Sequence, residues 1–150
     1  MGLIGASTLM KKLLFFLTLS GLTISAYSQN GKITGKLTYP GEGIPRDMVL
    51  CVRNTQKEPT YCSSTPAAKL REGKIVFKLN YRSASYDISL PSGSYYLYAT
   101  TNEMPGHKAY YNEFVRCGMS VDCRSKKQIA VKVKAGQTVK GITIGDFWHY

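Results

Sequence analysis

KIVFKLNYRSASYDISLPSGSYYLYATT, residues 74–101, carries the clearest structural pattern in the chain. Apolar and polar residues alternate in three short runs, 74–80, 86–90 and 94–101. A period of two residues places successive side chains on opposite faces of a β-strand. The runs are separated by Asn, Ser, Pro and Gly, which are typical of turns. The stretch therefore predicts three strands joined by short turns.

Further runs with the same alternation lie on both sides of this stretch. They cover residues 32–39, 48–54, 60–64, 128–134 and 139–144. No helical period is present that would supply the crossovers of a parallel sheet. We therefore predict an all-β fold, an antiparallel β-sandwich of seven or eight strands.

Two segments between the predicted strands lack a clean period. Residues 66–71 are expected to form a loop, and residues 102–125 form a longer irregular segment. Such a segment in a compact domain is usually functional, anchored by a disulfide, or both. Its candidate binding residues are aromatic or cationic: His107, Lys108, Tyr110, Tyr111, Phe114 and Arg116. Aromatic faces can stack on sugar rings; the alternative is that Tyr111 and Phe114 close the open end of the sandwich.

Residues 1–28 have the three parts of a secretory signal peptide. A basic start at residues 10–12 precedes the uncharged, largely apolar run 13–25. Residues 26–28 offer small side chains at the cleavage positions, so the mature protein would begin at Gln29, and Met10 is the expected true start. The alternative is an uncleaved anchor, but the apolar run is shorter than the roughly 20 residues of a spanning helix.

The mature part, residues 29–150, has the length of one domain. An even number of cysteines in an exported chain predicts disulfides. Of the three possible connectivities, the simplest pairs Cys51 with Cys62, in neighbouring predicted strands, and Cys117 with Cys123. The alternative is metal ligation, but the spacing of Cys117 and Cys123 does not match common zinc sites. We therefore predict no metal ligand.

The chain is strongly basic, with a formal net charge of +11. Two lysines of the signal peptide account for +2, so +9 remains in the mature part. This charge favours anionic partners, such as acidic glycans or a membrane surface, or it serves only solubility. The candidate basic face consists of lysines near the C-terminus: Lys126, Lys127, Lys132, Lys134 and Lys140. The alternative role for these lysines is to discourage pairing of edge strands.

The chain ends in an aromatic cluster formed by Phe147, Trp148 and Tyr150. We expect these side chains to pack over the edge of the sandwich. The alternative is that they form a docking site for a partner.

Several short motifs resemble those of carboxypeptidase regulatory-like domains. They are GKITG (31–35), GIP (43–45), VLCV (49–52), LPSGSYYL (90–97), VKVKAG (131–136) and VKGITI (139–144). The motifs at 31–35, 43–45 and 49–52 resemble the opening of such a domain. The motif at 90–97 resembles its L-P-x-G-x-Y strand start. The motifs at 131–136 and 139–144 resemble its closing hairpin. The resemblance implies a transthyretin-like (prealbumin-like) sandwich that acts as an accessory or interaction module. Residues 102–125 look like an insertion into the family pattern.

The sequence shows no recognisable catalytic arrangement. His107 and His149 have no carboxylate at the spacing of a zinc peptidase, and no Gly-x-Ser-x-Gly pattern occurs. We predict a periplasmic or secreted, non-catalytic binding module without a cofactor, whose partner is an envelope glycan, an anionic surface or another envelope protein. The alternatives are a structural protein of the envelope and, third, a small secreted hydrolase. Nucleic acid is not an expected partner, and membrane contact is expected only through the signal peptide during export.

Overall fold

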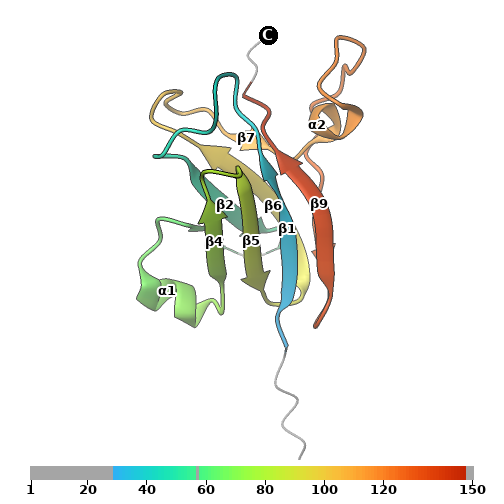
Figure 1. Cartoon of the computed structure of the whole chain (residues 1–150). Coiled ribbons are helices and arrows are strands. Elements are labelled where there is room, and N and C mark those ends of the chain that lie inside the picture. Colours follow the sequence, from blue (N-terminus) through green and yellow to red (C-terminus); the bar gives the residue numbers. More distant parts are fainter. Residues whose placement is uncertain (1–28, 57, 148–150) are drawn as a thin grey trace, which may run out of the picture.

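Two β-sheets packed face to face form the body of the protein (Figure 1). The computed structural model describes residues 29–56 and 58–147 of the chain. The predicted signal peptide, and Trp148, His149 and Tyr150 at the C-terminus, lie outside the described residues. The predicted all-β sandwich is therefore present in the part of the chain that the structure describes.

The first sheet has four strands in the order β4, β5, β1 and β9. Their bounds are β4 Val76–Asn80, β5 Ser85–Leu90, β1 Gly31–Leu37 and β9 Thr138–Ile144. Neighbouring strands are antiparallel except β1 and β9, which are parallel. The prediction of a wholly antiparallel sandwich was wrong at this pair, because the chain enters β1 and β9 from the same end of the sheet.

The second sheet has five strands, with the order β3, β2, β6 and β7 along its main path. Their bounds are β3 Tyr61–Cys62, β2 Val49–Asn54, β6 Gly93–Thr100 and β7 Ala109–Tyr110. The fifth strand, β8 Val131–Val133, pairs with the start of β6, whereas β7 pairs with its later part. The described residues thus form nine strands and not seven or eight. The additional strand is β7, which lies inside the segment predicted to be irregular.

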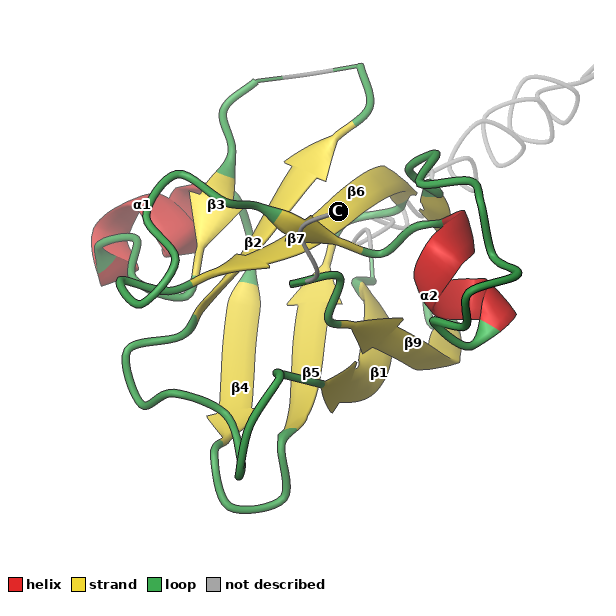
Figure 2. Ribbon diagram, turned by 90° about the horizontal axis from the view of Figure 1, so that it is seen from above, coloured by secondary structure: helices red, strands yellow, loops and turns green. Residues whose placement is uncertain are grey.

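Two short helices lie on different sides of the sandwich, α1 beyond β3 and α2 beside β9 (Figure 2). Helix α1 spans Ala67–Glu72, where a loop was predicted. That prediction was wrong because none of its residues is buried, so no apolar stripe marked the helix. Helix α2 spans Glu113–Cys117 and begins after Asn112, whose side-chain oxygen accepts a hydrogen bond from the Val115 N–H at 2.9 Å.

The predicted closing hairpin is absent, because β8 and β9 belong to different sheets. The turn between them lies against the start of β1. There the Lys32 N–H donates to the Gln137 carbonyl at 2.8 Å, and the Gly136 N–H donates to the Asn30 carbonyl at 3.2 Å. The turn thus carries the chain from one sheet to the other.

The core lies between the sheets and consists of the side chains that the alternation placed on inward faces. Those exposed by 2% or less include Ile33, Leu37, Met48, Leu50, Val52, Ile88, Leu97, Ala99, Val133 and Ile144. Both sheets contribute to this set, so each strand has one face inside the sandwich. The alternating pattern in the sequence is therefore explained by burial.

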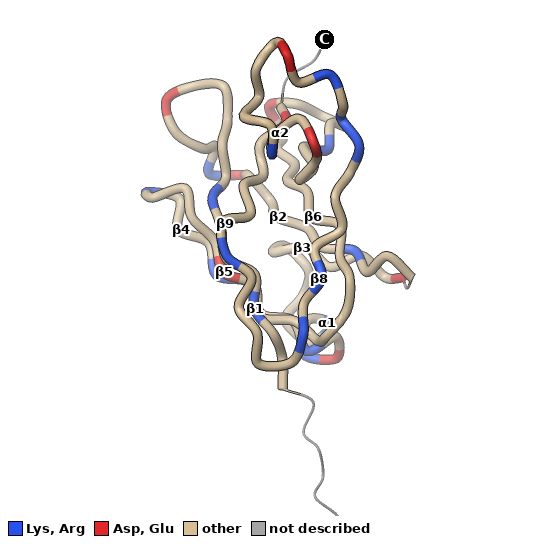
Figure 3. Tube along the Cα trace, turned by 90° about the vertical axis from the view of Figure 1, so that its right-hand side faces the viewer, with Lys and Arg blue, Asp and Glu red and all other residues tan. Residues whose placement is uncertain are grey.

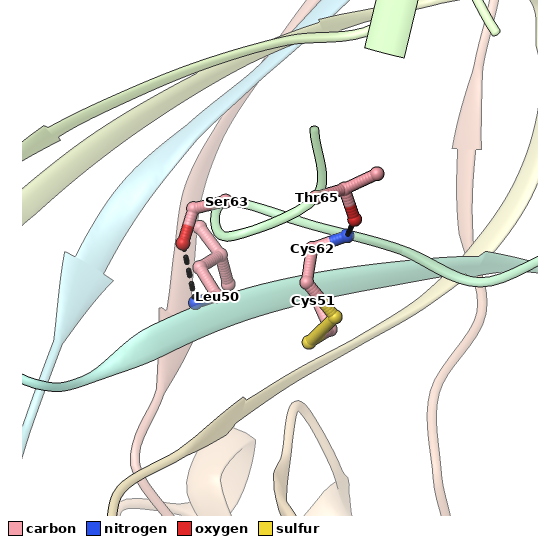
Figure 4. Close-up of a disulfide and its surroundings, with 5 residues drawn as sticks. All are labelled: Leu50, Cys51, Cys62, Ser63 and Thr65. Carbon is pink, nitrogen blue, oxygen red and sulfur yellow. Dashed lines mark hydrogen bonds between the residues drawn. A yellow bond between two sulfur atoms is a disulfide. The ribbon is translucent and has the colours of Figure 1, made fainter. Parts of the chain in front are cut away.

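Both predicted disulfides are present, Cys51–Cys62 and Cys117–Cys123. The first joins residues that are directly paired in β2 and β3 (Figure 4). Two side-chain hydrogen bonds support this region. The Leu50 N–H donates to Ser63 Oγ at 3.2 Å, from one side of the hairpin to the other, and the Cys62 N–H donates to Thr65 Oγ1 at 2.8 Å in the turn that follows β3. Two disulfides indicate an oxidising, non-cytoplasmic environment. Within the described residues, no helix has the length and apolar character needed to span a bilayer.

Replacing Cys51 and Cys62 together by alanine is expected to lower the free energy of unfolding by about 3 kcal/mol. The bridge constrains the unfolded chain over a sequence separation of 11 residues. The matched control replaces Cys117 and Cys123, which are separated by 6 residues, and is expected to cost about 2 kcal/mol. Chemical denaturation of both variants measures the two losses. An unchanged stability of the first variant would contradict the expectation.

Candidate functional site

A row of tyrosines lies on the outer face of the second sheet. Tyr96 and Tyr98 alternate along β6 with the core residues Leu97 and Ala99, so their rings point away from the core. Tyr110 of β7 is paired directly with Tyr98. The centroids of these two rings are 5.0 Å apart, with the ring planes tilted by 45°. The row therefore crosses two strands that are joined by an irregular segment.

Two cationic side chains lie over these rings. Arg53 of β2 is paired with Tyr96, and its guanidinium carbon is 5.5 Å from the centroid of that ring. Lys108 precedes β7, and its Nζ is 5.2 Å from the centroid of the Tyr98 ring. Cation–π contacts of this kind bring positive charge to the aromatic surface. Arg53 also lies 3.9 Å from the carboxylate of Glu58, whereas Lys108 has no ion pair within the described residues. We call Arg53, Tyr96, Tyr98, Lys108 and Tyr110 the tyrosine face.

Burial differs along the tyrosine face. Tyr98 is only 7% exposed, because its neighbours on the outer face cover it. This burial raises the pKa of the Tyr98 hydroxyl above its ordinary value. Tyr96 and Tyr110 remain partly exposed. Tyr98 is thus the packed centre of the face, and Tyr96 and Tyr110 are its partly exposed rings, with Arg53 over one side of Tyr96.

A groove of about 540 Å³ continues the tyrosine face toward the start of β6. It is lined by three segments, residues 54–56, 92–94 and 132–135. Ser94 of β6 is paired with Lys132 of β8 and lies two residues before Tyr96 on the same side of the strand. Ser94 and Lys132 of the groove lining therefore lie on the same side of the sheet as the tyrosine face.

The six predicted binding residues do not form a single surface. Lys108 and Tyr110 belong to the tyrosine face. Arg116 is exposed on α2. Phe114 of the same helix is only 3% exposed, and Lys126 lies over its ring with Nζ 5.2 Å from the centroid. The Phe114 side chain therefore packs inside the protein.

His107 and Tyr111 lie at the end of the sandwich, near the C-terminal residues. His107 Nε2 is 2.7 Å from the Asp146 carbonyl oxygen, and its ring lies 5.8 Å from the Phe147 ring between centroids. Tyr111 packs against the core cluster. Phe147 is buried and packs edge to face with Tyr39, with centroids 5.1 Å apart. The prediction that the C-terminal aromatic residues pack over the sandwich is thus confirmed for Phe147.

The Asp146 carboxylate anchors α2 to the end of β9. It is buried, at 5% residue exposure. Asn112 Nδ2 donates to it at 2.6 Å, and Lys126 Nζ forms an ion pair with it at 3.1 Å. Asn112 also caps α2, so one residue joins the helix to the carboxylate. This network ties the 102–125 segment, through Asn112, to the residues that follow β9.

The five lysines of the predicted basic face are also divided between segments. Figure 3 shows the Lys and Arg positions spread along the trace and not gathered on one strand. Lys132 and Lys134 line the groove. Lys126 and Lys127 belong to the segment beside α2, and Lys140 lies on β9 of the first sheet. The prediction assumed that the last two strands pair with each other. Because these strands belong to different sheets, their outward-facing lysines point from different surfaces.

Sequence reasoning missed Arg53, Tyr96 and Tyr98 as site residues. The alternation already placed Tyr96 and Tyr98 opposite the core residues of their strand. What it could not show is that β2 and β7 lie on either side of β6 and bring Arg53, Lys108 and Tyr110 to the same rings.

The fold and the site define a class of protein, an all-β sandwich with two disulfides and an aromatic, cationic outer face. Comparisons with protein-family models, with curated protein sequences and with solved structures found no match. The tyrosine face and the groove are therefore the features of this chain that bear on its function.

Proposed function

We propose that this chain is an exported, non-catalytic binding module of the cell envelope that holds a glycan on the tyrosine face. The observation that carries the proposal is the pair of partly exposed rings, Tyr96 and Tyr110, with Arg53 and Lys108 beside the row. Aromatic faces present a flat apolar surface to a sugar ring, and their hydroxyls and neighbouring cations supply hydrogen bonds. A sheet face holds such groups on a rigid support, which lowers the entropy cost of binding.

Export to the periplasm or to the exterior of the cell is part of the proposal. The predicted signal peptide at residues 1–28 supports it, and so do the disulfides, which persist in an oxidising compartment. The resemblance to carboxypeptidase regulatory-like domains supports an accessory role and a prealbumin-like sandwich. In keeping with it, the motifs at 31–35 and 49–52 lie on strands β1 and β2, and the motif at 90–97 runs from the last residue of β5 into β6.

A second candidate function is a structural protein that pairs with another envelope protein. The observation in its favour is β4, which lies at the edge of the first sheet and carries Val76 with 51% of its surface exposed. Strand edges with exposed apolar residues are templates for pairing with a further strand. A stable assembly of the exported protein without any glycan would favour this candidate.

The proposed function predicts that the double variant Tyr96→Ala, Tyr110→Ala loses about tenfold or more in glycan affinity, because both accessible rings are removed. We would purify the protein after export and screen envelope glycans for a rise in melting temperature. Affinities of the bound glycans for wild type and variant are then measured by calorimetry. Tyr81→Ala is the matched control, because Tyr81 is an exposed tyrosine on the other sheet's β4–β5 connection. An equal loss in the control, or no melting shift with any glycan, would argue against the proposal.

A further inference from the structure

The groove beside the tyrosine face is positively charged. Lys132 and Lys134 are both exposed in its lining, and none of the lining residues is acidic. Among the residues that the structure describes, no carboxylate lies within ion-pair distance of either lysine. Both side chains are therefore able to receive an anionic group from a ligand.

Neutral polar groups surround the two lysines. Asn54, Gln56, Ser92 and Ser94 line the same groove and offer amide and hydroxyl groups. Such groups bind sugar hydroxyls and carboxylate oxygens alike, because each is both a donor and an acceptor of hydrogen bonds. The lining is thus suited to a ligand that carries hydroxyls together with negative charge.

The spacing along β6 relates the groove to the tyrosine face. Lys132 is paired with Ser94, and Tyr110 is paired with Tyr98, four residues farther along the strand. At the rise of a β-strand this separation is roughly 13 Å. A single sugar ring does not cover both places, whereas an oligosaccharide can lie across them.

We infer that the bound glycan is acidic, with its rings on Tyr96 and Tyr110 and its carboxylate or sulfate groups in the groove beside Lys132 and Lys134. This inference rests on the proposed glycan-binding function and adds the chemical class of the ligand. The positive net charge of the chain is complementary to such a polyanion and accelerates its association at low salt.

The test compares two probes with the same sugar rings, an oligogalacturonate and the same oligomer with its carboxylates methyl-esterified. Calorimetry with the exported protein is expected to show about tenfold tighter binding of the acidic oligomer, because two lysines each contribute to it. Lys132→Gln, Lys134→Gln should reduce this preference, because the variant loses more affinity for the acidic oligomer than for the ester. The control Lys36→Gln, Lys140→Gln removes the same charge from the first sheet and should keep the preference.

Each other outcome has a defined meaning. Equal binding of both probes by the wild type overturns the inference but leaves the glycan-binding function standing. An equal loss of preference in the control variant overturns the assignment to the groove, because the effect then follows net charge. The same comparison is made with a sulfated oligosaccharide and its desulfated form, and the inference is overturned if neither anionic probe binds more tightly than its neutral counterpart. Failure of all glycans to bind overturns the proposed function and the inference together.

Discussion

Replacing Gly35 by alanine is expected to lower the free energy of unfolding by at least about 3 kcal/mol. Gly35 lies in β1, paired with Tyr86 of β5 on one side and with Ile142 of β9 on the other. A Cβ at this position would fall on the backbone carbonyl of Ile142. Because the obstacle is backbone and not a flexible side chain, β1 and β9 would have to move apart.

Such a movement would also break a buried hydrogen bond. The Tyr86 hydroxyl donates to the Ile142 carbonyl at 2.8 Å, and Tyr86 is only 4% exposed. Burial raises the pKa of Tyr86, so the hydroxyl remains a donor at any ordinary pH. Its separation from the carbonyl would leave two buried polar groups without a partner, which adds to the loss.

Urea denaturation of the Gly35→Ala variant measures this effect. The matched control is Lys36→Ala, the next residue of the strand, which is exposed and already has a Cβ. We expect the control to change the free energy of unfolding by less than about 0.5 kcal/mol. A loss below about 1 kcal/mol for Gly35→Ala would show that β1 and β9 do not approach each other as closely as described.

Replacing Phe147 by alanine is expected to cost about 3–5 kcal/mol, the usual range for a buried aromatic side chain. Phe147 is 2% exposed and belongs to the core cluster. Its ring contacts the rings of Tyr39 and His107 at the end of the sandwich. Removing it would leave a cavity that these neighbours fill only in part.

The measurement is thermal unfolding, in which a loss of this size lowers the melting temperature by about 10 °C or more. The control Phe147→Leu keeps most of the apolar volume and should cost less than about 1.5 kcal/mol. Glycan binding by the folded variant should not change, since Phe147 is not part of the tyrosine face or the groove. A melting temperature equal to that of the wild type would contradict the packing of the C-terminal end.

The strands and the core residues were predictable because both depend on neighbouring positions in the chain. Leu50 and Val52, or Leu97 and Ala99, alternate with outward residues since one face of each strand is buried. The Cys51–Cys62 pairing was predictable for a related reason, since its two strands follow each other closely. Helix α1 escaped prediction because no buried residue marks it.

The candidate site was predicted only in part. Lys108 and Tyr110 were among the expected binding residues, whereas Phe114 packs inside the protein. The lysines were expected on one face, but only Lys132 and Lys134 share the groove. Both differences have the same cause: strand pairing decides which residues share a surface, and the sequence does not show which strands pair.

From the amino-acid order alone, it was possible to derive an all-β sandwich, its inward side chains and its two disulfides. The parallel pairing of β1 with β9, the separation of β8 from β9 and the assembly of the tyrosine face became known from the folded chain. The reason is physical. The face on which a side chain lies follows from the alternation within its own strand, which is a local property of the sequence. The partner of a strand is a segment far away in the sequence, and it is decided only when those segments bury their apolar faces together.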